Sequence, residues 1–434
     1  MESANISEKP GPAAVEAGHG GEEDAGQNVV NTANQAPPED WFAWLQVLGA
    51  FSLNLNTWGL MNAFGVFQTF YQLDLLASKT SSEISWIGST QSFLMFLVSV
   101  FAGPIVDAGH LRPLLAVGSL LTVLGMFMTS LCTAFWQVFL AQAVAMGLGF
   151  GCLYVPAPTV VSQYFHASTA LAMGASSAGS ALGGIIYPII FTHLQPRIGF
   201  GWATRVIAFI VLATLLPVLF IMKTRAAPTS KYTLLDKSAF RDTPYLLLNL
   251  GLVFGFMGFY VIFYYIQLYA LQETSLSAPL QGYLLVVINA SSLLGRLVPG
   301  YYADMIGSIN MQTAVALVGG ILTFCLVVIK NAAGLVVFCV LYGFCAGAFM
   351  GLPAAGVVSL SLEKKSMIGT RLGMTLATVG CGVLVSNPIA GAILNGRGGW
   401  IGLIVWCGVL LMASCASMAA SRVAKVGFSW KGVI

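Results

Sequence analysis

Arg296 is the residue best suited to bind a charged ligand, because it is a single cation within a long apolar stretch. An arginine at the centre of a membrane-spanning helix costs roughly 2.5–3.5 kcal/mol, so its side chain must face the protein interior or a wet cavity. At about 100° per residue, Asn289 and Ser292 share its helical face. We therefore expect Arg296, Ser292 and Asn289 to contact a substrate. The alternative is that Arg296 reaches the nearer membrane surface or fixes a neighbouring helix.

A second polar stripe lies near the start of the apolar part of the chain. It comprises Asn54, Thr57, Trp58 and Asn62. These residues cover about 140° of one helical face. The stripe predicts a polar cavity wall in which Asn54, Trp58 and Asn62 bind substrate. Hydrogen bonds from Asn and Thr to a neighbouring helix are the equally weighted alternative.

Motifs for catalysis are absent from the sequence. It has no Gly-x-x-x-x-Gly-Lys-Ser/Thr phosphate loop, no His-Glu-x-x-His and no spaced Cys/His cluster. The eight cysteines all fall in apolar runs, where they are expected to act as small buried side chains without disulfides. We therefore expect no enzyme activity, no cofactor and no metal.

Composition places the chain in a lipid bilayer. Of 434 residues, 57% are hydrophobic and 8% are charged, whereas soluble domains carry about 25% charged residues. The net charge of +3 is spread over short loops, so a nucleic-acid partner is not expected. The expected partners are the bilayer and a small-molecule substrate.

Apolar runs near the length needed to cross a membrane predict an all-α protein with twelve transmembrane helices. The predicted spans are 44–70, 86–106, 113–132, 136–157, 169–192, 202–222, 245–270, 280–303, 311–330, 333–359, 367–395 and 400–421.

The loops divide these spans into two sets of six. Residues 1–40 hold eight acids and one base and are predicted to be a disordered tail. Residues 223–244 form the central loop between predicted six-helix bundles at 41–222 and 245–422, and 423–434 form a second tail. Lysine and arginine number 13 on the side of the termini and 5 on the other side, which predicts both termini in the cytosol. A cleavable signal peptide has a basic segment followed by an apolar run, and residues 1–40 show no such pattern, so we expect no signal peptide there.

The two halves repeat each other. Gly103 and Asp107 match Gly300 and Asp304 at an offset of 197 residues, and Pro156 matches Pro353 at the same offset. A constant offset indicates a parallel duplication, with the substrate near the membrane midplane between the halves.

Three stretches carry motifs of a known type. They are Asn56-Thr-Trp58-Gly-Leu-Met-Asn62-Ala-Phe-Gly-Val-Phe-Gln68, Tyr164-Phe165 with Leu171-Ala172-Met-Gly174, and Gly295-Arg296-Leu-Val-Pro299-Gly300 with Asp304 and Gly307. In them the chain, over residues 40–422, resembles the major facilitator superfamily, and within it the fungal branch of the monocarboxylate-porter family. The resemblance implies two six-helix bundles that alternate access to one site. It also implies gating by Asp107, Arg112 and Asp304 on the cytosolic rim, for which ordinary turn chemistry is the alternative.

Two positions depart from the animal lactate carriers of that family. Ser292 stands where they have an aspartate, and Asn62 stands where they have a lysine. Arginine cannot take their place as a proton carrier, because its guanidinium stays protonated. The proton scheme of those carriers therefore does not transfer to this chain.

Three functions remain open. The favoured one is export of an acid-bearing fungal secondary metabolite, because Ser292 and Asn62 remove the chemistry for a small carboxylate. Proton-coupled uptake of a monocarboxylate or vitamin-like compound is the second, and a non-transporting membrane sensor is the third. The plasma membrane is the expected location, with a vacuolar or other internal membrane as the alternative.

Overall fold

The computed structural model describes residues 40–165, 169–225, 235–274, 278–361 and 368–427, and every regular element in these ranges is a helix. The predicted tail 1–40 lies outside the described residues, apart from Asp40. The Oδ1 atom of Asp40 accepts a hydrogen bond of 3.1 Å from the backbone N–H of Ala43 and so caps the first helix.

The described residues form eleven helical stretches, one of which, α10 with α11, contains two helices merged across a kink at Gly199. In the first half they are built from α2 (Trp41–Asn56), α3 (Trp58–Asn62), α4 (Phe64–Phe70) and η1 (Tyr71–Leu75); α5 (Ser81–Asp107); α6 (Leu111–Thr129); α7 (Phe135–Val138), η2 (Phe139–Ala145), α8 (Met146–Tyr154) and α9 (Pro156–Tyr164); and α10 (Thr169–Leu215) with α11 (Val218–Ile221). In the second half they are built from η3 (Lys237–Arg241) and α12 (Thr243–Glu273); α13 (Ala278–Ile306); α14 (Ser308–Cys325) and η4 (Leu326–Val328); α15 (Ala332–Gly351) and α16 (Pro353–Leu360); α17 (Ile368–Asn395); and α18 (Gly399–Val426).

Among the described residues, ten helical stretches are long and apolar enough to span a membrane. Three of the predicted spans are present in altered form: the first is not among the ten, and the fifth and sixth together make up one of them. The first is broken into α2, α3, α4 and η1, and the fifth and sixth are joined in α10 through Gly199. Gly199 has φ of 79°, a left-handed value that glycine adopts without the steric cost of a side chain. The twelve predicted spans are therefore consistent with the structure.

The internal repeat predicted from sequence has a structural counterpart. The turns after α5 and α13 each contain a left-handed glycine, Gly109 with φ of 84° and Gly307 with φ of 96°. Pro156 and Pro353 each begin the second piece of a broken span, α9 and α16. Proline suits this position because its missing N–H is one that a helix start leaves unpaired.

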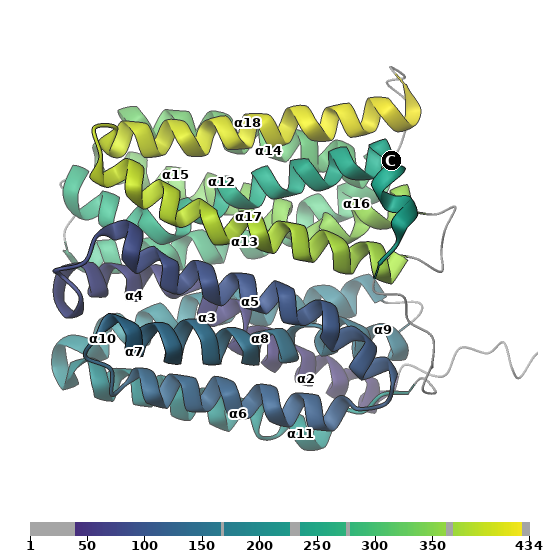
Figure 1. Ribbon diagram of the computed structural model, residues 1–434, viewed down its shortest axis with the longest axis horizontal. Coiled ribbons are helices and arrows are strands. Elements are labelled where there is room, and N and C mark those ends of the chain that lie inside the picture. Colours follow the sequence, from purple (N-terminus) through teal and green to yellow (C-terminus); the bar gives the residue numbers. More distant parts are fainter. Residues whose placement is uncertain (1–39, 166–168, 226–234, 275–277, 362–367, 428–434) are drawn as a thin grey trace, which may run out of the picture. The chain divides into compact units, whose positions relative to one another are not determined.

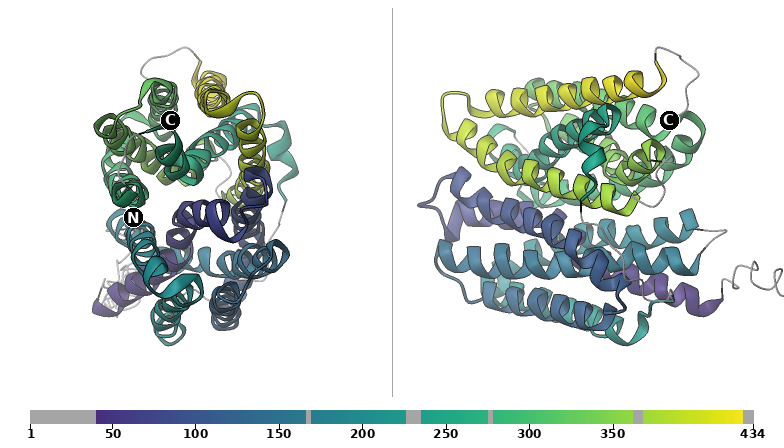
Figure 2. Two further views of the ribbon diagram at one scale, coloured as in Figure 1. Left: turned by 90° about the vertical axis from the view of Figure 1, so that its left-hand side faces the viewer. Right: turned by 45° about the vertical axis from the view of Figure 1, so that its right-hand side comes forward.

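The helices up to α11 lie together in the lower part of Figure 1, and those from α12 onward lie together in the upper part. The two sets meet where α5 packs on α17, α10 on α13 and α4 on α12 (Figures 1 and 2). We call the end of the bundle with Trp41 and Val426 the terminal end, and the end with Leu76 and Gly399 the far end.

Candidate functional site

Arg296 joins the two halves near the middle of the bundle. From α13, its Nη1 atom donates to the carbonyl oxygen of Ser177 at 3.3 Å and to the hydroxyl of Ser180, both on α10. Its Nε atom is buried and has no hydrogen-bond partner among the described residues. The hydrogen bonds that Arg296 makes to described residues all come from Nη1, which leaves the edge formed by Nε and Nη2. That edge has the geometry to hold a carboxylate through two parallel hydrogen bonds.

An aromatic cluster lies beside Arg296. Its members are Trp58, Phe96, Tyr154, Phe256, Tyr260 and Phe349, from α3, α5, α8, α12 and α15. Trp58 is at its centre, with ring centroids 5.7 Å from Phe96, 5.5 Å from Tyr154 and 6.5 Å from Tyr260. Phe256 stacks on Tyr260 at 6.0 Å and lies 5.7 Å from Phe349. The phenols of Tyr154 and Tyr260 lie in the neighbourhood of the Arg296 guanidinium. The two halves therefore both contribute rings to the surroundings of the cation.

A break in the first span positions Trp58. Thr57 has φ of −96° and ψ of −80°, outside helical values, and its hydroxyl donates to the carbonyl oxygen of Leu53 at 2.8 Å. The helix resumes as α3, which carries Trp58 and Asn62 one turn apart. Interrupted helices near the midplane are a common way to build substrate sites in transporters, because they expose backbone and side-chain polar groups.

Several buried polar atoms around this region lack a hydrogen-bond partner among the described residues. They include Oδ1 of Asn62, the hydroxyl of Tyr260, Nε of Arg296 and Oδ1 of Asn289. A buried polar group without a partner costs about 1–3 kcal/mol. Such groups are therefore expected to be paired in some functional state, and a bound substrate can supply the pairing.

Three other predicted site residues serve packing in this state. Asn54 donates through Nδ2 to the carbonyl oxygen of Ser176 at 3.1 Å, within the first half. Asn289 donates to the carbonyl oxygen of Gly184 at 3.2 Å, across the halves. Ser292 is buried, and its hydroxyl donates to the carbonyl oxygen of Asn289 at 2.8 Å.

The backbone of Ser292 faces α15 rather than the other half. A Cβ atom added at Gly347 of α15 would lie 2.1 Å from the carbonyl oxygen of Ser292. Arg296 and Asn289 instead contact α10, so the polar residues of α13 serve two different interfaces.

Of the three predicted gating residues, the structure describes the side chain of Arg112. The side chains of Asp107 and Asp304 lie outside the described part of the structure. Arg112 is exposed and forms no ion pair with a side chain that the structure describes. The gating role of Asp107, Arg112 and Asp304 therefore stays a prediction.

Hydrogen bonds between the halves are concentrated from the middle to the far end. At the far end the hydroxyl of Ser82 donates to the carbonyl oxygen of Pro388 at 2.8 Å. The hydroxyl of Tyr283 lies 3.2 Å from Nε2 of His193. Nearer the middle, Asn387 donates to the hydroxyl of Ser89 at 3.2 Å. Between described residues, the bonds of Arg296 are the cross-half hydrogen bonds nearest to the terminal end. The halves are thus held together at the far end.

Sequence reasoning did not identify Tyr154 and Tyr260 as members of the aromatic cluster, or Asn387 as a contact between the halves. Tyr260 belongs to the run Phe256-Met-Gly-Phe-Tyr-Val-Ile-Phe-Tyr-Tyr265, whose density of aromatic residues was the available signal. Asn387, next to Pro388, is interpreted from sequence alone as part of a simple helix kink, yet its side chain bonds across the halves. The described residues contain no group of three metal-binding side chains, and all eight cysteines are free.

Comparison of the sequence with known proteins finds one family model and several fungal transporters that are similar to it. Residues 47–369 match the sequence model of the Major Facilitator Superfamily. The MFS-type transporter dbaD of Emericella nidulans is 44% identical over 85% of this chain and 83% of its own length. The aspyridones efflux protein apdF of the same organism is 36% identical, over 90% of this chain and 79% of its own length. The agnestins efflux protein AgnL12 of Paecilomyces divaricatus is 36% identical over 90% of each chain.

Proposed function

The chain belongs to the Major Facilitator Superfamily, and from that premise we propose that it exports an acid-bearing, aromatic secondary metabolite by alternating access. Relatives that are 36% identical carry names that describe efflux of aspyridones and agnestins. Similarity over about nine tenths of the chain supports the same direction of transport here.

The observation that carries the substrate class is the position of Arg296 beside the aromatic cluster. A guanidinium whose Nε has no partner among the described residues suits a carboxylate or another acidic oxygen pair. Ring faces from Trp58, Tyr154 and Tyr260 suit a planar, conjugated partner, since aromatic pairs contribute about 0.5–1.5 kcal/mol beyond their buried area. A small aliphatic acid would use the cation but not the rings.

The distribution of contacts supports a mechanism of rocking halves. With the termini in the cytosol, as the basic residues predict, the far end faces outward and the structure is closed on that side. The substrate would reach Arg296 from the cytosol. The reverse state would need the far-end bonds of Ser82 and Tyr283, and the bond of Asn387 nearer the middle, to break. The aromatic cluster is tightly packed in this state, so space for the substrate must come from movement of its rings and helices.

Finer features are proposed on the same basis. The two bodies that move are residues 41–222 and 245–422, and residues 223–244 connect them. The protein lies in the plasma membrane. Within the superfamily it belongs to the fungal branch of the monocarboxylate-porter family. Substrate contacts come from Arg296, Trp58 and Asn62, with Asn54, Asn289 and Ser292 shaping the wall. If protons drive transport, their carrier is a group other than Arg296, because a guanidinium does not titrate in the physiological range.

Deletion of the gene in the organism that makes the protein tests the function directly. Metabolites of the medium and of the cells are compared by mass spectrometry with and without the gene. We expect at least one acidic aromatic metabolite to decrease in the medium and to accumulate in the cells, with recovery on re-expression. If cells without the gene instead consumed less of an acid supplied in the medium, the protein would be an uptake carrier. An unchanged distribution of acidic metabolites would contradict the export proposal.

A further inference from the structure

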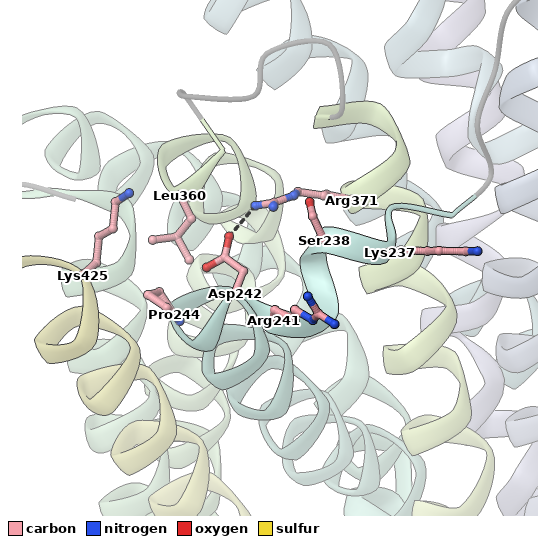
Figure 3. A pocket seen from close by; sticks show the side chains of 8 residues that line it. All are labelled: Lys237, Ser238, Arg241, Asp242, Pro244, Leu360, Arg371 and Lys425. Carbon is pink, nitrogen blue, oxygen red and sulfur yellow. Dashed lines mark hydrogen bonds and ion pairs between the residues drawn. The ribbon is translucent and has the colours of Figure 1, made fainter.

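A basic pocket lies at the terminal end of the second half, away from Arg296. The cavity has a volume of about 730 Å³ and is open to solvent. It is lined by Lys237, Ser238, Arg241, Asp242, Pro244, Leu360, Arg371 and Lys425 (Figure 3). These residues come from η3, the start of α12, the end of α16, the start of α17 and the end of α18. A chain whose residues are 8% charged thus places four cations around one cavity.

Arg371 is a buried arginine in the lining of the pocket, and its side chain is held in place by ion pairs. Its side chain is 1% exposed, its Nε lies 3.0 Å from Oδ2 of Asp236, and its Nη1 lies 2.8 Å from Oδ2 of Asp242. The guanidinium also stacks over the ring of Tyr245 at 5.2 Å. Its Nη2 atom is buried and has no hydrogen-bond partner among the described residues. An anion entering the pocket can supply the missing acceptor.

The two carboxylates beside Arg371 are ionised and offset two of the four positive charges, so the surroundings of the pocket keep a formal charge of +2. Hydrogen bonds from Ser238, and then the Arg371 guanidinium, lower the pKa of Asp236 to about 2. Asp242 both pairs with Arg371 and caps α12. Lys237, Arg241 and Lys425 add three more cations to the lining. Arg241 is exposed and makes no hydrogen bond or ion pair with a described residue, so it can turn toward a ligand.

We propose that this basic pocket binds a phosphate-bearing anion, with the headgroup of an anionic phospholipid as the favoured source. The volume is in the range of small-molecule sites, about 300–1,000 Å³, and exceeds what one inorganic phosphate would fill. Leu235 and Phe240 are exposed beside Lys237 and Arg241. An apolar and basic rim at a helix end is typical of segments that lie at the membrane surface. Basic pockets at the ends of transmembrane helices are able to hold lipid headgroups.

The test uses full-length protein in detergent and four probes. The probes are dioctanoyl phosphatidylinositol 4,5-bisphosphate, dioctanoyl phosphatidylcholine, inositol 1,4,5-trisphosphate and inorganic phosphate, with binding titrated by native mass spectrometry. The pocket variant is Lys237→Gln/Arg241→Gln, which leaves the buried Arg371 pairs intact. The control is Lys223→Gln/Arg225→Gln, which removes the same charge from exposed residues at the start of the central loop.

We expect saturable binding of the bisphosphate lipid by the wild type and by the control. The pocket variant should bind about 30-fold more weakly, because each cation near an anionic headgroup contributes about fivefold. Preference for the lipid over inositol trisphosphate would identify a membrane headgroup as the source, and equal binding would identify a soluble phosphate compound. Absence of binding by the wild type, or equal weakening in both double variants, would overturn the proposal.

Discussion

The Nη1 atom of Arg296 lies 3.3 Å from the carbonyl oxygen of Ser177, so the cation on α13 is bound to the opposite half. The sequence offered two interpretations of Arg296, a substrate anchor and a structural tether. Its Nη1 atom acts as a tether in this state, while its Nε atom remains without a described partner. An acid that binds at Arg296 would therefore bind next to a contact between the halves.

Substitution of Gly391 tests whether the far-end contacts hold one transport state. A Cβ atom added at Gly391 would lie 2.6 Å from the backbone nitrogen of Ser82, which cannot move aside as the tip of a side chain can. Gly391→Ala should therefore open the far end. The distance between spin labels at Lys79 and Arg397, measured by electron-electron resonance with accessible native cysteines replaced, should lengthen.

The matched control for this experiment is Gly373→Ala on the same helix. There an added Cβ would lie 3.6 Å from a methyl group of Val100, which is ordinary van der Waals contact. The distance distribution should stay as in wild type. Identical distributions for Gly391→Ala and wild type would show that this contact does not select the state.

Tyr260→Phe tests whether the unpartnered hydroxyl serves the substrate. The hydroxyl of Tyr260 is buried without a described partner, so its removal should leave the melting temperature unchanged or raise it. Affinity for the exported metabolite should fall about 2–10-fold if the hydroxyl bonds to it, since one neutral hydrogen bond contributes about 0.5–1.5 kcal/mol. Tyr264→Phe is the control, because that hydroxyl lies 3.2 Å from the hydroxyl of Ser92 and its loss should lower stability instead. Unchanged affinity in Tyr260→Phe would remove Tyr260 from the site.

Asp236→Asn should reveal a pH-dependent contribution to stability. The pKa of Asp236 is about 2 in the folded protein, below the usual value of about 3.9 for an unfolded chain. Its ionised form therefore stabilises the fold fully above about pH 5, by on the order of 1–2 kcal/mol, and the contribution disappears as pH falls through 2. The difference in unfolding free energy between wild type and variant, measured in detergent, should decrease to about half near pH 3. A difference that stays constant from pH 6 to pH 3 would mean that no ionised pair is involved.

The orientation of the chain is tested by protease protection. The excess of 13 basic residues against 5 predicts cytosolic termini. Protease added to intact cells should spare an epitope tag placed before Met1, and detergent should expose it. Cleavage of the tag in intact cells would reverse the assignment of the two ends.

Span positions and the internal repeat could be predicted from the sequence because they depend on local properties. Apolar length predicts the helices, and the repeat pairs Pro156 with Pro353, each of which begins the second piece of a broken span. The break at Thr57 was not predicted, because no proline marks it and the departure of its backbone angles from helical values depends on packing.

The site could be predicted only in part. Arg296 stands out because a buried charge is costly wherever it packs. Its partners Ser177 and Ser180 are more than 110 residues distant along the chain, so no local pattern connects them. For the same reason the sequence did not show that Asn54 bonds within its own half, or that Tyr154 and Tyr260 meet around Trp58.

The most direct measurement compares transport of the exported acid and of its methyl ester by wild type, Arg296→Lys and Arg296→Ala, each normalised to folded protein. Wild type should prefer the acid. Arg296→Lys should lose roughly 1.5–3 kcal/mol of that preference, because an ammonium cannot form the paired hydrogen bonds of a guanidinium. Arg296→Ala should reach the membrane at normal abundance and carry acid and ester alike. Equal transport of both compounds by wild type, or loss of folding in Arg296→Ala, would contradict the role of Arg296 as the acid anchor.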